Sequence, residues 1–246
     1  MDKFIRKQNN VQKENLTFQI LSWEAFDDEI IPDDCDSSDT EEPIQDMRYH
    51  IYAFGVDESG ESVCVRFENY KPYFFACIPD NLQHSFDDYK KKEEERCIRN
   101  KLFKSKEDLE SVSIVKRKKY KGFTNEKEYK FLRFVCKNLN TFNRIKYILN
   151  PKDKLRLPKI SNIDPINKLK FDLYESNIEP YIRFTHKMNI PMAGWGSVDK
   201  ITQDNEISRC QNSYSSNYTT VKRYEKQEVC NLTLGSWDIE AFSHSS

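Results

Sequence analysis

The 246-residue chain has few glycines and no long apolar segment, and each scarcity excludes a class of protein. Only 6 glycines are present, and none belongs to a glycine-rich loop of the kind that holds phosphate groups. No stretch approaches the ~20 apolar residues of a membrane-spanning helix. The amino terminus lacks the apolar core of a signal peptide. We therefore expect no membrane partner.

The cysteines and histidines form none of the common functional motifs. The 7 cysteines are odd in number and contain none of the short paired spacings of a zinc site or a dense disulfide framework. The 4 histidines are scattered, and none lies beside a cysteine or serine in a nucleophile pattern. These features exclude the common zinc and nucleophile motifs and predict a reducing, intracellular environment.

Charge is balanced overall but divided along the chain. Lys and Arg number 39 and Asp and Glu 40, which gives a net charge of −1. Residues 24–46 hold 11 acids and no Lys or Arg, whereas residues 116–170 hold 17 basic residues and 4 acids. We interpret 24–46 as a solvated or disordered acidic loop. A polyanionic partner would have to contact the middle of the chain.

Alternation and turn residues predict a β-rich first half. Acidic turn residues and Gly60 between two β-forming runs indicate a hairpin, and Pro72 is expected at the start or edge of an aromatic strand. The charge-dense segment 86–111 is typical of a solvated helix. The expected strands are 16–23, 48–56, 61–67 and 73–78, with a second β region over 116–135 and a short helix over 141–149.

The sequence of the second half of the chain predicts a further helix that lies between strands. Residues 171–176 form a strand pattern, Ser176 and Asn177 are candidate helix caps, and apolar residues then recur at helical spacing until about Asn189. Pro180 fits the first turn of that helix. Residues 190–196 are expected to break the helix and lead into another strand, followed by a polar loop over 203–216 and strands over 218–223 and 232–239.

Two carboxylates near the end of the sequence could carry chemistry. Successive side chains of a strand point to opposite faces, so Asp238 and Glu240 would share one face. Paired oxygen ligands suit Mg²⁺ or Mn²⁺, and two such ions can activate water and stabilise the leaving oxygen in phosphodiester cleavage. A D-x-E triplet is common by chance. Its apolar lead-in, LTLGSW, favours a core strand, where unpaired carboxylates would be costly.

These residues lie in a segment that resembles a known family. LGSWDIEAFS resembles the first exonuclease motif of B-family DNA polymerases, whose D-x-E carboxylates bind the two metal ions of the 3′→5′ proofreading site. LYESNIEPYIRFTHKMNIPMAGWGSV resembles the segment just upstream in delta-type members. KRKKYKGF, NYKPYFFACIP and FQILSWEAFD resemble earlier blocks of the same family in the same order. The similarity extends over roughly 16–243.

The resemblance implies an α+β fold. Residues 16–223 would form the mixed, β-rich polymerase N-terminal domain, with OB-like and RNA-recognition-like parts, after an extension over 1–15. Residues 224–246 would contain the first strand of an incomplete RNase H-like exonuclease domain. The sequence is thus expected to be a fragment, or half of a split polymerase, from a large DNA virus or a eukaryote, acting in the nucleus or at a cytoplasmic viral replication site.

The resemblance also implies a function. The chain would be the N-terminal portion of a DNA-directed DNA polymerase, a nucleotidyltransferase of DNA replication, and Asp238 and Glu240 would be catalytic and bind Mg²⁺ or Mn²⁺. With its two-ion site incomplete, the polypeptide alone is expected to be inactive. Its partners would be template and primer DNA, the remaining exonuclease, palm, fingers and thumb polypeptide, and a sliding clamp. The alternative is a self-standing OB-like nucleic-acid-binding or scaffold module derived from a polymerase.

A basic stretch is the candidate DNA contact. Its cations could bind the phosphate backbone, and Tyr120 and Phe123 could stack on bases. The opposing interpretation is a solvated loop in a chain rich in Lys, Asn and Ile throughout, as A+T-rich coding sequence would produce. The candidate nucleic-acid-binding residues are Lys116, Arg117, Lys118, Lys119, Tyr120 and Lys121.

Overall fold

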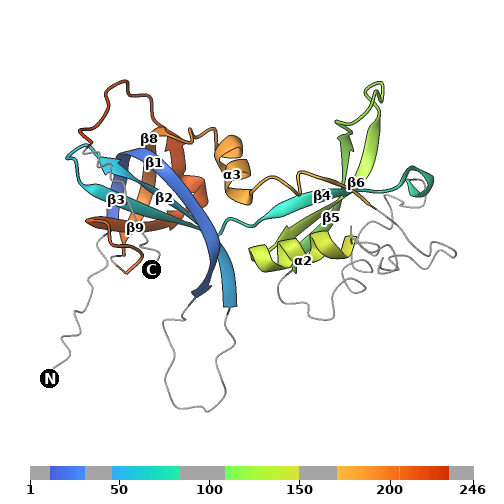
Figure 1. Cartoon of the computed structure of the whole chain (residues 1–246), viewed down its shortest axis with the longest axis horizontal. Coiled ribbons are helices and arrows are strands. Elements are labelled where there is room, and N and C mark those ends of the chain that lie inside the picture. The colour runs from blue at the N-terminus through green and yellow to red at the C-terminus, as the bar shows by residue number, and fades with distance from the viewer. Residues whose placement is uncertain (1–11, 31–45, 84–108, 150–170, 205, 233–246) are drawn as a thin grey trace, which may run out of the picture.

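A computed structural model describes residues 12–30, 46–83, 109–149, 171–204 and 206–232, and these form a β-rich structure with two sheets and two α-helices (Figure 1). The first sheet contains β1 (Gln12–Ile30), β2 (Asp46–Asp57), β3 (Ser62–Glu68), β8 (Gly194–Gln203), β9 (Asn212–Asn217) and β10 (Val221–Arg223). The second contains β4 (Tyr73–Cys77), β5 (Leu109–Lys118), β6 (Glu128–Cys136) and β7 (Asp172–Tyr174). The helices are α2 (Leu139–Leu149) and α3 (Pro180–Met188), with 3-10 turns η1 (Asp80–Leu82) and η4 (Tyr218–Thr220).

The first sheet closes on itself. Its strand order is β1-β2-β3-β9-β8-β10, and β1 also pairs with β8, so five strands form a continuous ring. All of its strand pairs are antiparallel except β3 with β9. Gly55 permits the close contact of β1 and β2, because a Cβ there would lie 2.1 Å from the carbonyl oxygen of Gln19. The ring encloses one apolar core, and β10 lies outside it, paired with β8 alone among the described strands.

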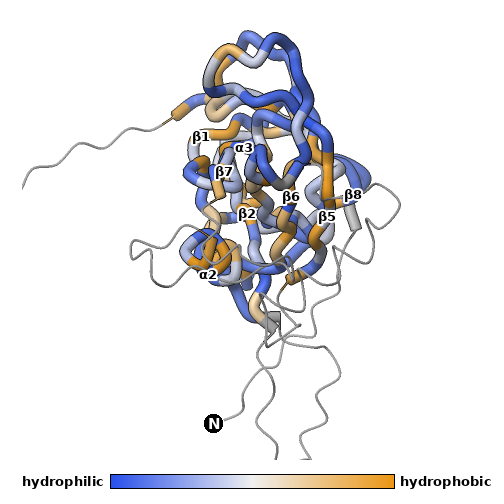
Figure 2. The backbone as a smooth tube through the Cα atoms, turned by 90° about the vertical axis from the view of Figure 1, so that its right-hand side faces the viewer, coloured by the Kyte–Doolittle hydropathy of each residue, from blue (hydrophilic) through white to orange (hydrophobic). Residues whose placement is uncertain are grey.

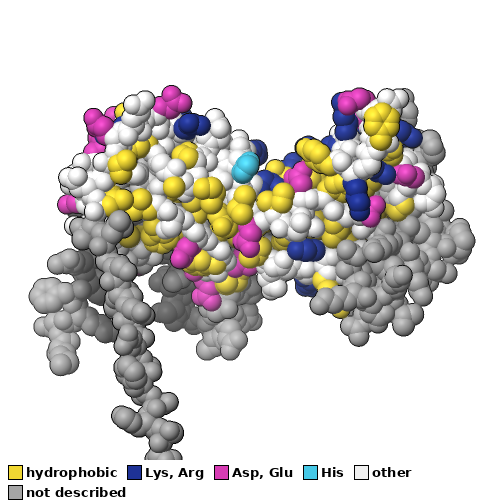
Figure 3. Space-filling view, turned by 45° about the horizontal axis from the view of Figure 1, so that its top comes forward, with side chains coloured by type: hydrophobic (Ala, Val, Ile, Leu, Met, Phe, Trp, Pro, Cys, Tyr) yellow, Lys and Arg dark blue, Asp and Glu magenta, His cyan; other side chains and the backbone are white. Residues whose placement is uncertain are grey.

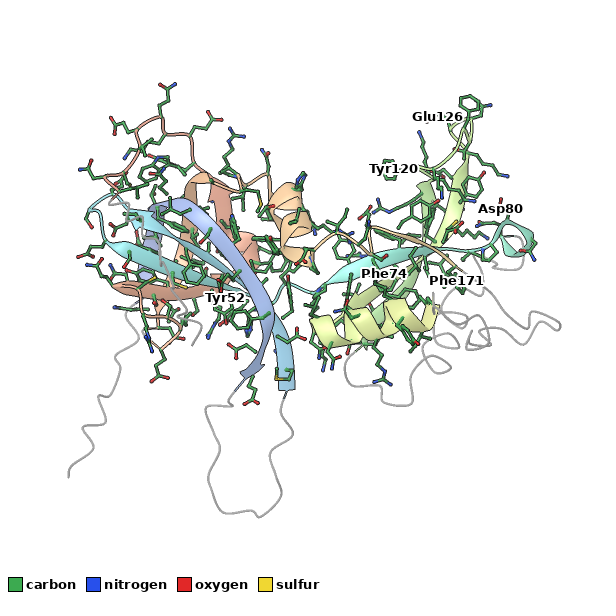
Figure 4. All side chains as sticks on the ribbon, viewed as in Figure 1. Tyr52, Phe74, Asp80, Tyr120, Glu126 and Phe171 are labelled. Atoms are coloured by element: carbon green, nitrogen blue, oxygen red, sulfur yellow. The ribbon has the colours of Figure 1, made fainter. Side chains whose placement is uncertain are left out.

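The second sheet is open and fully antiparallel, with the order β5-β6-β4-β7. Helix α2 covers one of its faces, where Phe142 and Ile145 pack with Phe74, Phe134 and other buried side chains. Figure 4 places the labelled Phe74 on the body of this sheet and Tyr120 on the hairpin above it. The strands of this sheet are largely hydrophobic in its body and become hydrophilic towards the β5–β6 hairpin tip (Figure 2).

Side-chain contacts connect the sheets, among them those of Asp27 and Arg183. Asp27 of β1 accepts hydrogen bonds from the backbone N–H groups of Leu139 and Asn140, at 2.6 and 2.9 Å, at the start of α2. Arg183 of α3 lies over the ring of Tyr73 at 4.4 Å and donates to the carbonyl oxygens of Tyr73 and Glu175. Both contacts join the closed sheet to the open one.

The predicted acidic loop was wrong at its amino-terminal end. Residues 24–30 continue β1 and pair with β2 as far as Ile30 opposite Asp46. Phe26 stacks on Tyr52 with ring centroids 4.7 Å apart, and the Tyr52 hydroxyl donates to Asp28 at 2.9 Å. Pairing partners supplied by a distant strand override the local acidic composition. Residues 31–45 lie outside the described part of the chain.

Three other local predictions were wrong. Leu109–Ser111 belongs to β5 rather than to a helix, while 86–108 lies outside the described residues. Part of the predicted polar loop 203–216 is β9, whose partner β3 is more than 140 residues away. The N-cap of α3 is Glu179, without a side-chain capping bond, rather than Ser176 or Asn177.

Two predicted β segments are confirmed only in part: 218–223 is strand only in β10, after the 3-10 turn η4, and the predicted region 116–135 is interrupted by the connection 119–127 between β5 and β6. Several other local predictions on described residues are confirmed. The hairpin turn lies between β2 and β3, with Gly60 at a φ of 89°, and Pro72 directly precedes β4. The predicted helix 141–149 corresponds to α2. Helix α3 begins at Pro180 and ends at Met188, and Asn189 caps it in the left-handed conformation. The strand predicted over 232–239 lies almost wholly outside the described residues.

Candidate nucleic-acid interface

The carboxylates Asp238 and Glu240 lie outside the residues that the structure describes. Among the described residues, no group of three or more His, Cys, Asp or Glu side chains could hold a metal ion. The predicted two-metal site therefore stays a prediction from the sequence. The basic stretch, by contrast, is fully described.

The basic stretch lies at the end of the β5–β6 hairpin. Lys116, Arg117 and Lys118 are the last residues of β5, and residues 119–121 begin the connection to β6. This hairpin rises from the open sheet on the side away from α2 (Figure 1), and basic, acidic and hydrophobic side chains are mixed over its surface (Figure 3). The ring of Tyr120 is 90% exposed.

The cations of the stretch lie against aromatic rings. The guanidinium carbon of Arg117 lies 4.5 Å from the centre of the Phe75 ring. The ammonium nitrogen of Lys119 lies 3.9 Å from the centre of the Tyr129 ring. Such cation–π contacts position each charge above the open sheet face.

Two of these cations also have carboxylate partners. Lys119 pairs with Asp80 at 2.7 Å, and Lys118 pairs with Glu126. Burial lowers the pKa of Lys119, but the hydrogen bond to Asp80 and nearby negative charge outweigh this effect and raise the pKa above its ordinary value. Lys119 is therefore protonated at neutral pH. Arg117 forms no ion pair with any described residue.

Beneath the cations lies an aromatic cluster on the sheet face that α2 does not cover. Phe75 and Phe131 are buried there, and the Tyr174 ring meets Phe131 edge-on with centroids 5.1 Å apart. Burial raises the pKa of the neighbouring Cys77 thiol to about 11 and also raises that of Tyr174. Both groups are neutral at pH 7, so the positive charge of this face comes from its Lys and Arg side chains.

The basic stretch and the aromatic cluster line one groove. Its volume is about 340 Å³, near the lower end of the ~300–1,000 Å³ typical of small-molecule sites. The lining residues are Phe75, Arg117, Lys118, Lys119, Tyr120, Phe131, Tyr174 and Glu175. The structure thus brings together four of the six residues predicted to bind nucleic acid. Lys116 and Lys121 lie outside the groove.

Comparison with known proteins identifies the family. Residues 171–246 match the family model "DNA polymerase family B, exonuclease domain". The chain is 30% identical over 237 residues to the DNA polymerase of Pyramimonas orientalis virus, covering 95% of this chain and 18% of that protein. It is also 30% identical over 236 residues to the DNA polymerase of Acanthamoeba polyphaga mimivirus, covering 92% and 12%. The chain belongs to the family B DNA polymerases.

The chain spans less than one fifth of the length of those two viral relatives. A solved family B DNA polymerase from the archaeon Pyrobaculum calidifontis aligns with 80% of this chain and 19% of its own, at 16% identity and a TM-score of 0.47. No helix among the described residues is long and apolar enough to cross a membrane.

The aromatic wall of the groove was not predicted from the sequence. The signal was present in residues 73–77, which are apolar on both alternating faces, and this is unusual for a sheet with one solvated face. Phe74 and Phe134 face α2, whereas Phe75 and Phe131 face the groove. Tyr174 could not have been assigned without the pairing of β7 with β4.

Proposed function

We propose that this chain is the N-terminal portion of a DNA-directed DNA polymerase that acts in DNA replication and carries the first motif of a 3′→5′ proofreading exonuclease. The observation that carries the proposal is the similarity over 95% of the chain to a viral DNA polymerase, together with the exonuclease-domain match over 171–246. Template and primer DNA would then be its ligand, and the remainder of the polymerase its partner.

The architecture supports a division within residues 16–223. The closed five-stranded ring has the form of an OB-like part. The open sheet, with its strand order and a helix on one face, has the form of an RNA-recognition-like part. Residues 224–246 would begin the exonuclease domain. Hydrogen exchange on the 246-residue chain should therefore report two protected units, one for each sheet.

Asp238 and Glu240 are proposed as carboxylate ligands of Mg²⁺ or Mn²⁺ in the exonuclease site. When bound, paired ions supply an activated water and stabilise the leaving oxygen. Two carboxylates alone hold two hydrated ions weakly, so the 246-residue chain should not degrade single-stranded DNA. Metal-dependent degradation that Asp238→Ala abolishes would contradict this expectation. Weak Mn²⁺ binding that Asp238→Ala and Glu240→Ala each reduce would support the ligand assignment.

The basic stretch is proposed as a contact to the DNA backbone. Its test replaces Lys116, Arg117, Lys118, Lys119 and Lys121 together by Gln. Single-strand affinity should fall, and the slope of log affinity against log salt should become shallower, because fewer counterions are released. An unchanged single-strand affinity with an unchanged salt slope would contradict the proposal. Replacing exposed cations outside the hairpin, Lys187 and Arg223, should have a much smaller effect.

A self-standing nucleic-acid-binding module is the second candidate. The groove favours it, because all of its lining residues lie within the two described sheets and their connections. Sequencing of the transcript distinguishes the two candidates. A reading frame that continues with the remaining polymerase motifs supports the polymerase portion, and its absence supports the module.

A further inference from the structure

The closed sheet extends past its ring as a two-stranded ribbon (Figure 1). Strand β8 pairs with β1 only as far as Ile20, and β3 pairs with β2 only from Ile51 onward. Beyond these points, among the described strands, β1 and β2 pair only with each other, and this pairing runs to Ile30 opposite Asp46. The ribbon therefore has two outer edges, one on each strand.

The outer edge of β2 is covered by the segment that leads into α2. The backbone N–H of Tyr49 donates to the carbonyl oxygen of Lys137 at 3.1 Å. The carbonyl oxygen of Met47 accepts a hydrogen bond from the side-chain amide of Asn138, also at 3.1 Å. These two outward backbone groups of β2 are thus satisfied within the chain.

The outer edge of β1 has no such cover. Residues that lie opposite each other in an antiparallel pair direct their backbone groups either toward each other or both outward. The two β2 residues of that covered edge direct theirs outward, so Asp27 and Glu29, which lie opposite them, do the same, and alternation adds Ala25. The Glu29 N–H is bonded to the Asp28 carboxylate at 2.9 Å. The backbone groups of Ala25 and Asp27 have no partner beyond β2 among the described residues, so this edge can pair with another strand.

The side chains beside this edge are acidic and aromatic. Residues 24–29, which we call the open β1 edge, hold 4 acids and no Lys or Arg. Phe26 is 44% exposed and stacks on Tyr52, whose hydroxyl donates to Asp28. Arg48, opposite Asp28 on β2, is the only Lys or Arg that β2 contributes to the ribbon. The edge would repel a polyanion, whereas a strand with Lys or Arg beside β-branched residues would form favourable cross-strand pairs with it.

We propose that the open β1 edge receives an extended, basic segment of a partner protein as an additional strand. Backbone hydrogen bonds to Ala25 and Asp27 supply affinity, and the acids together with Phe26 select side chains at alternate positions of the bound segment. The site lies on the closed sheet and takes a cationic peptide, so it is independent of the proposed DNA contact on the open sheet.

The test measures binding of two labelled peptides to the 246-residue chain by fluorescence anisotropy. The first peptide alternates Lys and Val and is long enough to span residues 21–30. The second has the same sequence with N-methyl groups on two adjacent central residues, whose N–H groups point to opposite edges of a strand, so it keeps its charge but cannot pair fully. The first should bind at least about tenfold more tightly, because several hydrogen bonds are lost in the second. Equal affinity, or no binding of either peptide, would overturn the proposal.

A matched pair of variants locates the effect on the strand. Glu24→Lys should weaken binding of the first peptide at least about threefold, because like charges on neighbouring strands are destabilising. Glu14→Lys is the control, because Glu14 is an exposed acid of the same strand in the part that β8 already covers. It lies beyond the ~8 Å over which exposed charges interact at physiological salt. Circular dichroism verifies that both variants fold. Equal weakening by the two substitutions would overturn the assignment to the open β1 edge.

Hydrogen exchange then identifies the backbone groups involved. The first peptide should slow exchange of the Ala25 and Asp27 amides and leave the part of β1 that pairs with β8 unchanged. Protection confined to other segments would overturn the proposal. A longer polymerase chain that contains these residues should also bind the first peptide. Failure of that longer chain to bind would show that the same protein covers the edge, and would overturn its assignment to a partner.

Discussion

The two sheets use aromatic side chains in different ways. In the closed sheet the rings gather in one core, where Phe184 of α3 lies within 5.5–6.4 Å of the ring centres of Trp23, Phe67, Tyr70 and Tyr218. In the open sheet they divide between two faces. Phe74 stacks on Phe134 under α2, whereas other rings lie under cations on the uncovered face.

This difference follows from closure. A closed ring has one interior, so its inward side chains must pack together and exclude water. An open sheet has a second face, and rings there are stabilised by cations above them instead of by a helix. The closed sheet is therefore expected to determine stability, and the open face to determine DNA binding.

The largest expected effect tests the closed core. Phe184 is fully buried and meets four aromatic neighbours, so Phe184→Ala should lower the free energy of unfolding by about 3–5 kcal/mol. Denaturant titration followed by circular dichroism measures the change. Phe123→Ala on the hairpin is the control, because a side chain that is 96% exposed should change stability by less than about 0.5 kcal/mol. Equal effects of the two would refute the proposed division of roles.

The sequence predicted local elements well and distant pairings poorly. The turn at Gly60, the break at Pro72 and the end of α3 follow from single-residue backbone preferences. The strand character of residues 24–30 and of β9 depends on partners far along the chain, which local composition cannot reveal. Strand order, and with it closure of the first sheet, also depends on such pairings.

The candidate site was predictable only in part. Consecutive Lys and Arg residues can be recognised from the sequence alone, so the basic stretch was predicted. The groove needed Phe75, Phe131 and Tyr174 to be assigned to one face, which follows from the register of β4 with β6 and β7. The roles of Asp238 and Glu240 depend on family resemblance, and no described residue tests them.

A second prediction concerns the connection between the sheets. Arg183 is 92% buried, pairs with Glu175 and donates to two backbone carbonyls, so Arg183→Met should leave those acceptors unpaired. We expect a loss of about 2–3 kcal/mol, in the range for hydrogen bonds to charged groups. Arg183→Lys should recover only part of the lost stability, because lysine lacks the planar guanidinium group that donates several hydrogen bonds in a fixed geometry. If the connection couples the sheets, calorimetry of Arg183→Met should show a broader transition than the unmodified chain.

A third, smaller effect is expected where β1 meets α2. Asp27 accepts from the first N–H groups of the helix and places a negative charge at its positive end. Asp27→Ala should therefore lower stability by about 1 kcal/mol. Asp28→Ala provides a comparison on the neighbouring residue, whose carboxylate bonds to Tyr52 within the first sheet instead. Hydrogen exchange should show faster opening of α2 in Asp27→Ala, and unchanged exchange there in Asp28→Ala.

The smallest expected effect is a pH dependence of the free energy of unfolding that arises from His50 in the closed sheet. No strand of the open sheet contains a histidine. Burial, reinforced by the positive charge of Arg66, lowers the pKa of His50 in β2 below its ordinary 6.5. Below pH 6.5 the unfolded chain therefore binds a proton at this residue that the folded chain refuses. Stability should fall as pH decreases from 7 to 6, at no more than about 1.4 kcal/mol per pH unit. In His50→Gln the slope over this range should be shallower, whatever the absolute stability, because carboxylates titrate alike in both proteins. Identical slopes would mean that His50 is protonated equally in the folded and unfolded states.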